Sequence, residues 1–213
     1  MRLILDRAHG RLNDDRGNGF EPATRQWQPD TASAEGEPVT PIEALHWLQH
    51  ASGRPLRTPV AVIGTRTPTQ EQEQAAEQTG LLLARHGLTV LCGGRAGVME
   101  AVCRGVANGG GLSIGLLPDT EPEAANPYVT VPLATGIGVA RNALIGRAAH
   151  SLIAIGGGYG TLSEIAFALQ FGRPVFLLEG APAVDGAARC ANPDEALEQV
   201  ARAVLRLPDS AAG

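Results

Sequence analysis

The stretch GGGYGTLSE, residues 156–164, places a threonine and a carboxylate immediately after a run of glycines. It follows the apolar run SLIAI (151–155) and opens an expected helix from about 159 to Gly172. Glycine lets a backbone approach a ligand closely, and a helix N-terminus presents unpaired N–H groups and the positive end of the helix dipole. The pattern predicts an anion site, most simply for phosphate. Its candidate residues are Gly157, Gly158, Tyr159, Gly160 and Thr161.

A second glycine turn, GGRAGVM (93–99), follows another apolar run, and a third loop begins where the run VAVIG (60–64) ends. Ligands of parallel α/β sheets bind outside the carboxyl ends of the strands, so we expect these loops to meet there. Two glycine turns on neighbouring strands can hold one phosphate from two sides. The further candidate residues are Gly64, Thr65, Gly93, Gly94, Gly97, Val98 and Met99.

Glu164 lies about one helical turn beyond Gly160, so it can face the same cleft without touching the phosphate. A carboxylate in that place can contact a sugar or activate water. Arg141, in GIGVARNALIGRAAH, precedes the SLIAI run and can supply a fixed positive charge opposite Glu164. Glu164 is therefore a candidate catalytic residue, whereas an arginine on a helix, such as Arg141, is by itself more often a surface charge.

Other kinds of site have weaker support. Gly156-x-Gly158-x-x-Thr161 approximates a dinucleotide fingerprint, with Glu179 placed to hold a ribose hydroxyl, but the third glycine is a threonine. His46 and His50 lie four residues apart, yet no third metal ligand is evident. We expect no metal and no cofactor.

The composition narrows the possible functions. The chain has 213 residues and a formal net charge of -5, which argues against a nucleic-acid or membrane-surface partner. All 17 basic residues are arginine, which excludes a pyridoxal phosphate Schiff base and a Walker phosphate loop, because both require lysine. Three scattered cysteines and a charged N-terminus predict a cytoplasmic protein whose cysteines are core residues.

Short apolar runs alternate with helical segments from about residue 60 onward, which indicates buried parallel strands joined by helices. The expected fold is α/β: a doubly wound, mostly parallel Rossmann-like sheet with helices on both faces. The expected strands are 60–64, 88–92, 112–117, 127–131, 151–155 and 174–178. TPIE (40–43), TPTQ (67–70) and NPDE (192–195) each predict a capped helix start.

The first part of the chain has a different character. Residues 1 to about 39 are rich in turn formers, so either a hairpin or a loosely ordered extension is compatible with them. We therefore expect an N-terminal extension over 1–55, with a possible hairpin and one helix, and a Rossmann-like domain over 56–213.

Three stretches together resemble the LOG ("lonely guy") superfamily of Rossmann-like proteins, in particular its bacterial branch close to molybdenum-cofactor carriers. They are GGRAGVMEAVCRGVANGGGLSIGLLP, NPYVTVPLATGIGVARN and AIGGGYGTLSEIAFALQFGRPVFLL. The resemblance covers roughly residues 58–180. It implies hydrolysis of the N-glycosidic bond of nucleoside 5′-monophosphates by Glu164 and Arg141, which match the family's PGGxGTxxE loop and its upstream arginine. It also implies self-association as a homodimer or a dimer of dimers that completes the pocket.

Some positions depart from the family pattern. Gly156 stands where the signature has proline, Ser163 where many active members have a second glutamate, and Ala140 and Asn142 flank Arg141 where histidine and lysine are usual. A non-catalytic carrier or sensor of a nucleotide or molybdenum cofactor is therefore the alternative to a phosphoribohydrolase.

Overall fold

The computed structural model describes residues 1–30 and 36–208, which form two compact units. One unit contains Met1–Leu56 together with the C-terminal segment from Glu198, and the other contains Arg57–Leu197. The expected division assigned everything after residue 55 to the second domain. The structure instead groups the last part of the chain with the N-terminal residues.

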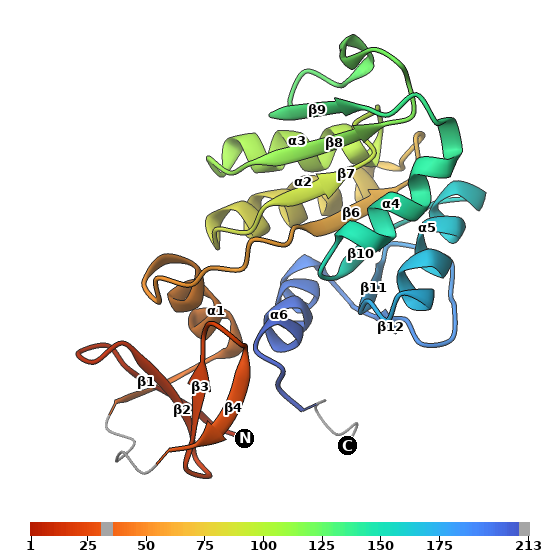
Figure 1. The fold of residues 1–213 in the computed structure, drawn as a ribbon. Coiled ribbons are helices and arrows are strands. Elements are labelled where there is room, and N and C mark those ends of the chain that lie inside the picture. Colours follow the sequence, from red (N-terminus) through yellow and green to blue (C-terminus); the bar gives the residue numbers. More distant parts are fainter. Residues whose placement is uncertain (31–35, 209–213) are drawn as a thin grey trace. The chain divides into compact units, whose positions relative to one another are not determined.

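The larger unit is built on a seven-stranded sheet in which every strand pair is parallel (Figure 1). The strand order is β12-β11-β10-β6-β7-β8-β9. Its strands are β6 (Val60–Gly64), β7 (Val90–Cys92), β8 (Ser113–Leu117), β9 (Val131–Ala134), β10 (Leu152–Ile155), β11 (Val175–Leu178) and β12 (Ala188–Arg189). The chain runs outward from β6 to β9, then returns to the other side of β6 at β10. The point where the strand order reverses therefore lies between β6 and β10.

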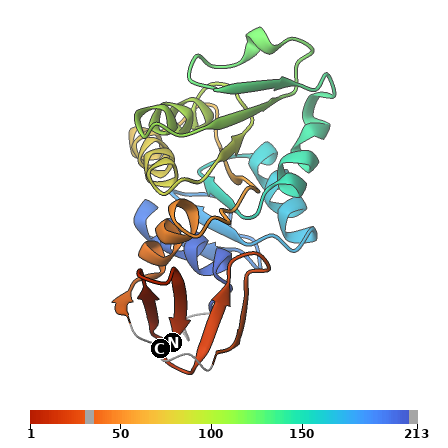
Figure 2. The same cartoon turned by 60° about the vertical axis from the view of Figure 1, so that its left-hand side comes forward.

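Helices cover both faces of this sheet, as the doubly wound fold requires. Figure 2 shows α2 and α3 on one face and α4 and α5 on the other. The bounds are α2 (Gln70–Arg85), α3 (Val98–Asn108), α4 (Arg141–Ala148) and α5 (Tyr159–Gln170), with short 3-10 turns η1 (Pro122–Ala124) and η2 (Gly138–Ala140). The expected fold class is confirmed.

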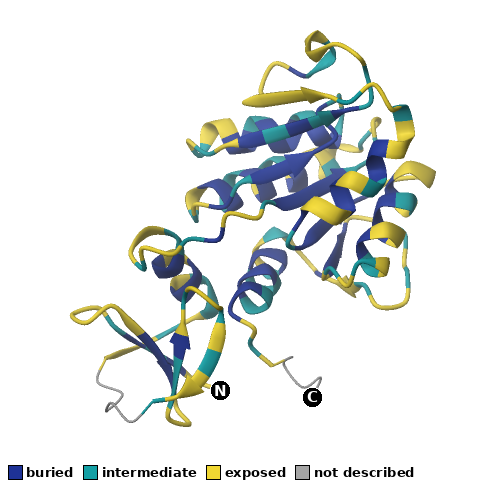
Figure 3. Cartoon of the chain, viewed as in Figure 1, coloured by how far each residue is buried: buried dark blue, intermediate teal, exposed yellow. Residues whose placement is uncertain are grey.

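The strands of the centre are apolar because both of their faces are buried. All four residues of β10 are buried, and so are the first four of β6 (Figure 3). On the α4 and α5 side, Ile145 and Ile165 pack with Leu152 in one continuous core. This core holds α4 and α5 rigidly against the strand ends from which the candidate site is built.

Two expected boundaries were wrong. The segment 127–131 is mostly a turn, in which Asn126 Oδ1 accepts from the Tyr128 amide at 3.1 Å, and the strand begins only at Val131. Helix α2 begins after Thr69 rather than after Thr67, because Thr69 and Gln72 form the capping box. In both places a short polar side chain two or three residues away took over the local hydrogen bonds.

The smaller unit contains a five-stranded antiparallel sheet of order β4-β3-β2-β1-β5 and the helix α1 (Pro41–His50). Its strands are β1 (Leu3–Asp6), β2 (Arg11–Asp14), β3 (Asn18–Glu21), β4 (Gln26–Pro29) and β5 (Glu37–Val39). Thr40 caps α1 through a capping box with Glu43, as its sequence predicts. The N-terminal residues thus form a larger sheet than a single hairpin.

Helix α6 (Pro193–Val204) begins in the larger unit and ends in the smaller one. Within the smaller unit, Trp27 Nε1 donates to the Leu205 carbonyl at 2.7 Å, and Val204 and Leu205 are fully buried. These contacts explain why the end of the chain belongs with the N-terminal sheet. Among the helices in the described ranges, none combines the length and apolar character needed to cross a membrane.

Candidate functional site

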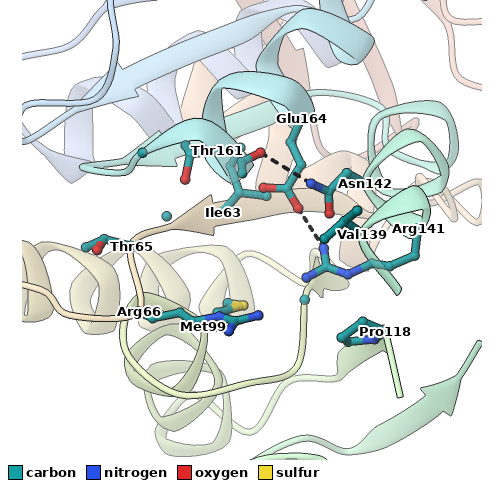
Figure 4. Close-up of a pocket in the computed structure, with 14 residues that line it drawn as sticks. Ile63, Thr65, Arg66, Met99, Pro118, Val139, Arg141, Asn142, Thr161 and Glu164 are labelled. Atoms are coloured by element: carbon teal, nitrogen blue, oxygen red, sulfur yellow. Dashed lines mark hydrogen bonds and ion pairs between the residues drawn. The ribbon is translucent and has the colours of Figure 1, made fainter. Parts of the chain in front are cut away.

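A cavity of about 290 Å³ lies at the carboxyl ends of β6, β7 and β10, beside the reversal of strand order. Its wall comes from the loops after these strands and from the first turns of α4 and α5 (Figure 4). The lining residues are Ile63, Gly64, Thr65, Arg66, Gly93, Met99, Pro118, Val139, Arg141, Asn142, Gly158, Gly160, Thr161 and Glu164. The three loops expected from the sequence therefore converge on one space.

Arg141 and Glu164 meet inside this cavity. Arg141 Nη1 donates to Glu164 Oε1 at 2.7 Å, and the two side chains are only 7% and 8% exposed. Burial raises the pKa of Glu164 to about 7, although the neighbouring Arg141 charge and its hydrogen bond oppose that rise. Near neutral pH this carboxyl group can therefore hold or release a proton, which is the property a general acid or base needs.

Gly93 makes room for this ion pair. A Cβ at this position would lie 2.5 Å from Arg141 Nη2 and 2.7 Å from Met99 Sδ. Any larger residue would displace the Arg141 guanidinium or the Met99 side chain from its present position. Gly93 therefore acts in the site through the absence of a side chain.

The N-terminus of α5 forms the second chemical feature of the cavity. Gly158 caps the helix, and Gly158, Gly160 and Thr161 line the space. The first amides of a helix have no intrahelical acceptor, so they can donate to an anion. A Cβ on Gly158 or Gly160 would meet nothing within 4 Å, so the space beside both residues is open.

The second glycine turn contributes less than its sequence predicts. Only Gly93 and Met99 of this turn line the cavity. Gly94 packs against Gly115 and Leu117. The Val98 amide at the start of α3 is already bonded to the Thr65 carbonyl at 3.0 Å.

Three other expected residues also lie outside the lining. Gly97 packs against the backbone of Arg66, and a Cβ on Gly97 would lie 2.6 Å from the Arg66 carbonyl group. Gly157 adopts a φ of +127° and packs on the Thr161 side chain. Tyr159 is 93% exposed, so its side chain points to solvent.

Several lining residues were absent from the sequence prediction, namely Ile63, Arg66, Pro118, Val139 and Asn142. Arg66 had a signal, because it lies inside the predicted loop after β6. Its guanidinium and that of Arg141 provide two positive charges for the single carboxylate of Glu164. Pro118 and Val139 come from loops whose sequences carry no comparable signal.

The departure at Gly156 has a structural explanation. Gly156 adopts a φ of +55°, which proline cannot reach, and a Cβ there would lie 2.5 Å from Gln72 Nε2. Gln72 Nε2 donates to the Glu179 carbonyl at 2.9 Å and so ties α2 to the end of β11. Glu179 itself is not part of the cavity wall, so the cavity offers no support for the dinucleotide interpretation.

Cys92 and Cys103 are separated in sequence but meet in the core, with their Sγ atoms 3.5 Å apart. Hydrogen bonding to Cys103 and burial raise the pKa of the Cys92 thiol, which makes it a poor nucleophile. In the described parts of the chain no three His, Cys, Asp or Glu residues are grouped to hold a metal ion.

Comparisons with known proteins identify the family of this chain. The model of the SLOG cluster4 family matches residues 57–205. A probable cytokinin riboside 5′-monophosphate phosphoribohydrolase from Oryza sativa subsp. japonica is 35% identical over 123 residues. That match covers 54% of this chain and only 52% of the rice protein.

Two solved structures match this chain over nearly the whole of their own length. The molybdenum cofactor binding protein of the phototrophic bacterium Rippkaea orientalis is 32% identical, with a TM-score of 0.64, covering 68% of this chain and 96% of that protein. The Moco carrier protein of Chlamydomonas reinhardtii is 30% identical, with a TM-score of 0.64, covering 71% of this chain and all of that protein (100%). The resemblance to the LOG superfamily, near its molybdenum-cofactor carriers, is thus confirmed.

Proposed function

Because the chain belongs to the SLOG cluster4 family, we propose that its cavity binds a nucleoside 5′-monophosphate and hydrolyses the N-glycosidic bond. The products are the free base and ribose 5-phosphate. The observation that carries the proposal is the buried ion pair of Arg141 with Glu164, one helical turn from free amides at the start of α5.

The phosphate binds at the N-terminus of α5, where the amides of Gly158–Thr161 donate to its oxygens. The Thr161 hydroxyl and the Arg66 guanidinium add a donor and a charge. Binding at this end places the pentose beside Glu164, about one helical turn farther along α5. The energy of phosphate binding then orients the bond that breaks.

Glu164 acts on the sugar carbon that carries the base. As a carboxylate it takes a proton from the attacking water, or it stabilises the positive charge that develops on the pentose as the base leaves. Arg141 keeps Glu164 in place and favours its ionised form. Water adds to this carbon while its bond to the base nitrogen breaks, and the departing base takes up a proton.

A molybdenum-cofactor carrier is the second candidate function. Two solved proteins of that kind, 32% and 30% identical to this chain, support it. The same amides would then hold the phosphate of the cofactor, with Glu164 as a ligand contact. The cytoplasm is the proposed location in either case, because Cys92, Cys103 and Cys190 all carry free thiols.

We propose a homodimer as the assembled state. Val139 and Tyr159 are 83% and 93% exposed at the starts of α4 and α5. Leu144, Leu162 and Phe167 are further exposed apolar side chains on the same two helices. An exposed apolar surface of this kind is typical of a protein interface, and here it borders the cavity. Light scattering after size exclusion should give twice the chain mass of 22.1 kDa.

Incubation with AMP, GMP, CMP and a cytokinin nucleotide, followed by chromatography for free base, tests the activity. Release by the wild type that Glu164→Ala abolishes supports the hydrolase. Thermal stabilisation by nucleotide without release, or by molybdenum cofactor alone, supports the carrier. Stabilisation by NAD far above that by AMP would instead favour the dinucleotide interpretation.

A further inference from the structure

Asn142 and Ser163 form a second bridge between α4 and α5, directly beside the ion pair. Asn142 follows Arg141 on α4, and Ser163 precedes Glu164 on α5. Asn142 Nδ2 lies 2.8 Å from Ser163 Oγ and 3.4 Å from the Gly160 carbonyl. Two of the positions that depart from the family pattern are therefore partners of each other.

The hydrogen bonds determine which way the Asn142 amide points. Ser163 Oγ lies 2.7 Å from the Gly160 carbonyl, which can only accept, so the hydroxyl proton is used there. The hydroxyl must then accept from Asn142, and the Asn142 group that faces it must be the NH₂ group. Rotating the amide would set two acceptors against each other and leave a buried group unsatisfied.

This orientation leaves the carboxamide oxygen for the cavity. Asn142 lines the cavity and is only 7% exposed, so its carboxamide has a fixed position in the cavity wall. In Figure 4 the Asn142 nitrogen points to the start of α5, and the oxygen points away from it. Ser163 does not line the cavity; it acts on the site through Asn142.

The position of Asn142 relative to the start of α5 indicates which part of the ligand its carboxamide oxygen would contact. Its partner Ser163 lies next to Glu164, and both lie about one helical turn beyond the amides that would hold the phosphate. In a 5′-nucleotide, the group adjacent to the phosphate is the pentose, whose hydroxyls are hydrogen-bond donors.

Resting on the proposed function, we infer that Asn142 Oδ1 accepts a hydrogen bond from a pentose hydroxyl and selects ribonucleotides over deoxyribonucleotides. Asn142 is then a specificity-determining residue, and Ser163 is the positioning residue that fixes its amide.

The test is calorimetric binding of AMP, 2′-deoxy-AMP and 3′-deoxy-AMP to the wild-type protein and to variants. The wild type should bind AMP about tenfold more tightly than one of the deoxy forms, as expected for one neutral hydrogen bond. Asn142→Ala should reduce that ratio to near 1. Ser163→Ala should reduce it in the same way, because the freed amide can turn its NH₂ group to the ligand, whereas Ser163→Thr should restore it.

A matched control is Gln170→Ala, on the exposed far end of α5, which should leave the ratio unchanged. A merely structural role for Asn142 would weaken the binding of all three ligands equally without changing the ratio, and that result would overturn the inference. A wild type that binds AMP without preferring it to either deoxy form would overturn it as well. No AMP binding by the wild type would refute the proposed nucleotide function itself, and the inference with it.

Discussion

Replacing Gly93 by alanine should disturb the ion pair of Arg141 and Glu164 without changing either residue. The new Cβ would lie 2.5 Å from Arg141 Nη2 and 3.0 Å from Arg141 Cζ. Restoring an ordinary contact of 3.4 Å requires the guanidinium to retreat by about 1 Å. A shift of that size should weaken or break the 2.7 Å bond to Glu164, because its length and angle both change. A charge-assisted hydrogen bond contributes about 1.5–3 kcal/mol, so kcat for base release should fall about 10- to 150-fold.

The same substitution should change the titration of Glu164. Arg141 holds down the pKa that burial raises to about 7, so a weaker contact between the guanidinium and Glu164 should raise this pKa further. Carbon NMR of the Glu164 carboxyl group measures the shift and does not depend on the reaction that the protein catalyses.

Two variants control this experiment. Gly160→Ala also adds a Cβ at the cavity wall, but nothing lies within 4 Å of it, so the Glu164 pKa should not move. Gly93→Ala combined with Met99→Ala removes the contact with the sulfur and keeps the contact with Arg141, so it should not restore activity. Base release within twofold of the wild type, together with an unchanged Glu164 pKa in Gly93→Ala, would refute the reasoning.

Other predictions concern the acid, the loop and the smaller unit. Glu164→Gln should abolish base release and retain AMP binding within a few-fold, as chromatography and calorimetry would measure; unchanged release would contradict the assigned role. The pKa of Glu164 lies above its ordinary value of 4.5, at about 7, so the folded protein holds this proton more tightly than the unfolded chain. Its contribution to stability is therefore complete below pH 4.5 and disappears as the pH rises through 7. Relative to Glu164→Gln, the free energy of unfolding of the wild type, measured with urea, should fall by up to about 3 kcal/mol over that pH range. The same pH dependence in both proteins would exclude this contribution of Glu164. Gly156→Pro restores the family residue but cannot adopt a φ of +55°, so it should lower the Tm even when Gln72 is also replaced by alanine; an unchanged Tm would show that the loop can take another path. Trp27→Phe removes the donor to the Leu205 carbonyl and should lower the free energy of unfolding by about 1 kcal/mol without affecting base release. Denaturant unfolding measures the first effect, and the chromatographic assay measures the second.

The local signals of the larger unit predicted its fold well because they are redundant. The apolar runs at 60–64, 88–92 and 151–155 correspond to strands that are almost entirely buried, and each of these strands is followed directly by a helix. Errors occurred where a single polar side chain decided the outcome. Asn126 converted the start of an expected strand into a turn, and Thr69 took the capping role assigned to Thr67.

In the candidate site, too, some residues could be predicted from the sequence and some contacts could not. Glu164 and the glycine turn at the start of α5 have residue types and spacings that indicate their chemistry, whereas Arg141 was indicated by the resemblance to the LOG superfamily. The contact of Gly93 with Arg141, and the bridge from Asn142 to Ser163, join residues 48 and 21 positions apart. No local pattern reports such contacts, since they depend on how α4, α5 and the β7 loop pack.

The amino-acid sequence by itself predicted the alternation of strands and helices in the larger unit, the glycine turn that we propose binds an anion, and Glu164 as a candidate acid. These features follow from propensities and periodicities that act within about one helical turn. Only the tertiary structure decided that the end of the chain joins the N-terminal sheet, that the second glycine turn mainly supports the β6 loop, and which way the Asn142 amide points. Those outcomes depend on burial and on hydrogen bonds between distant segments, whose energies arise only once the segments are packed together.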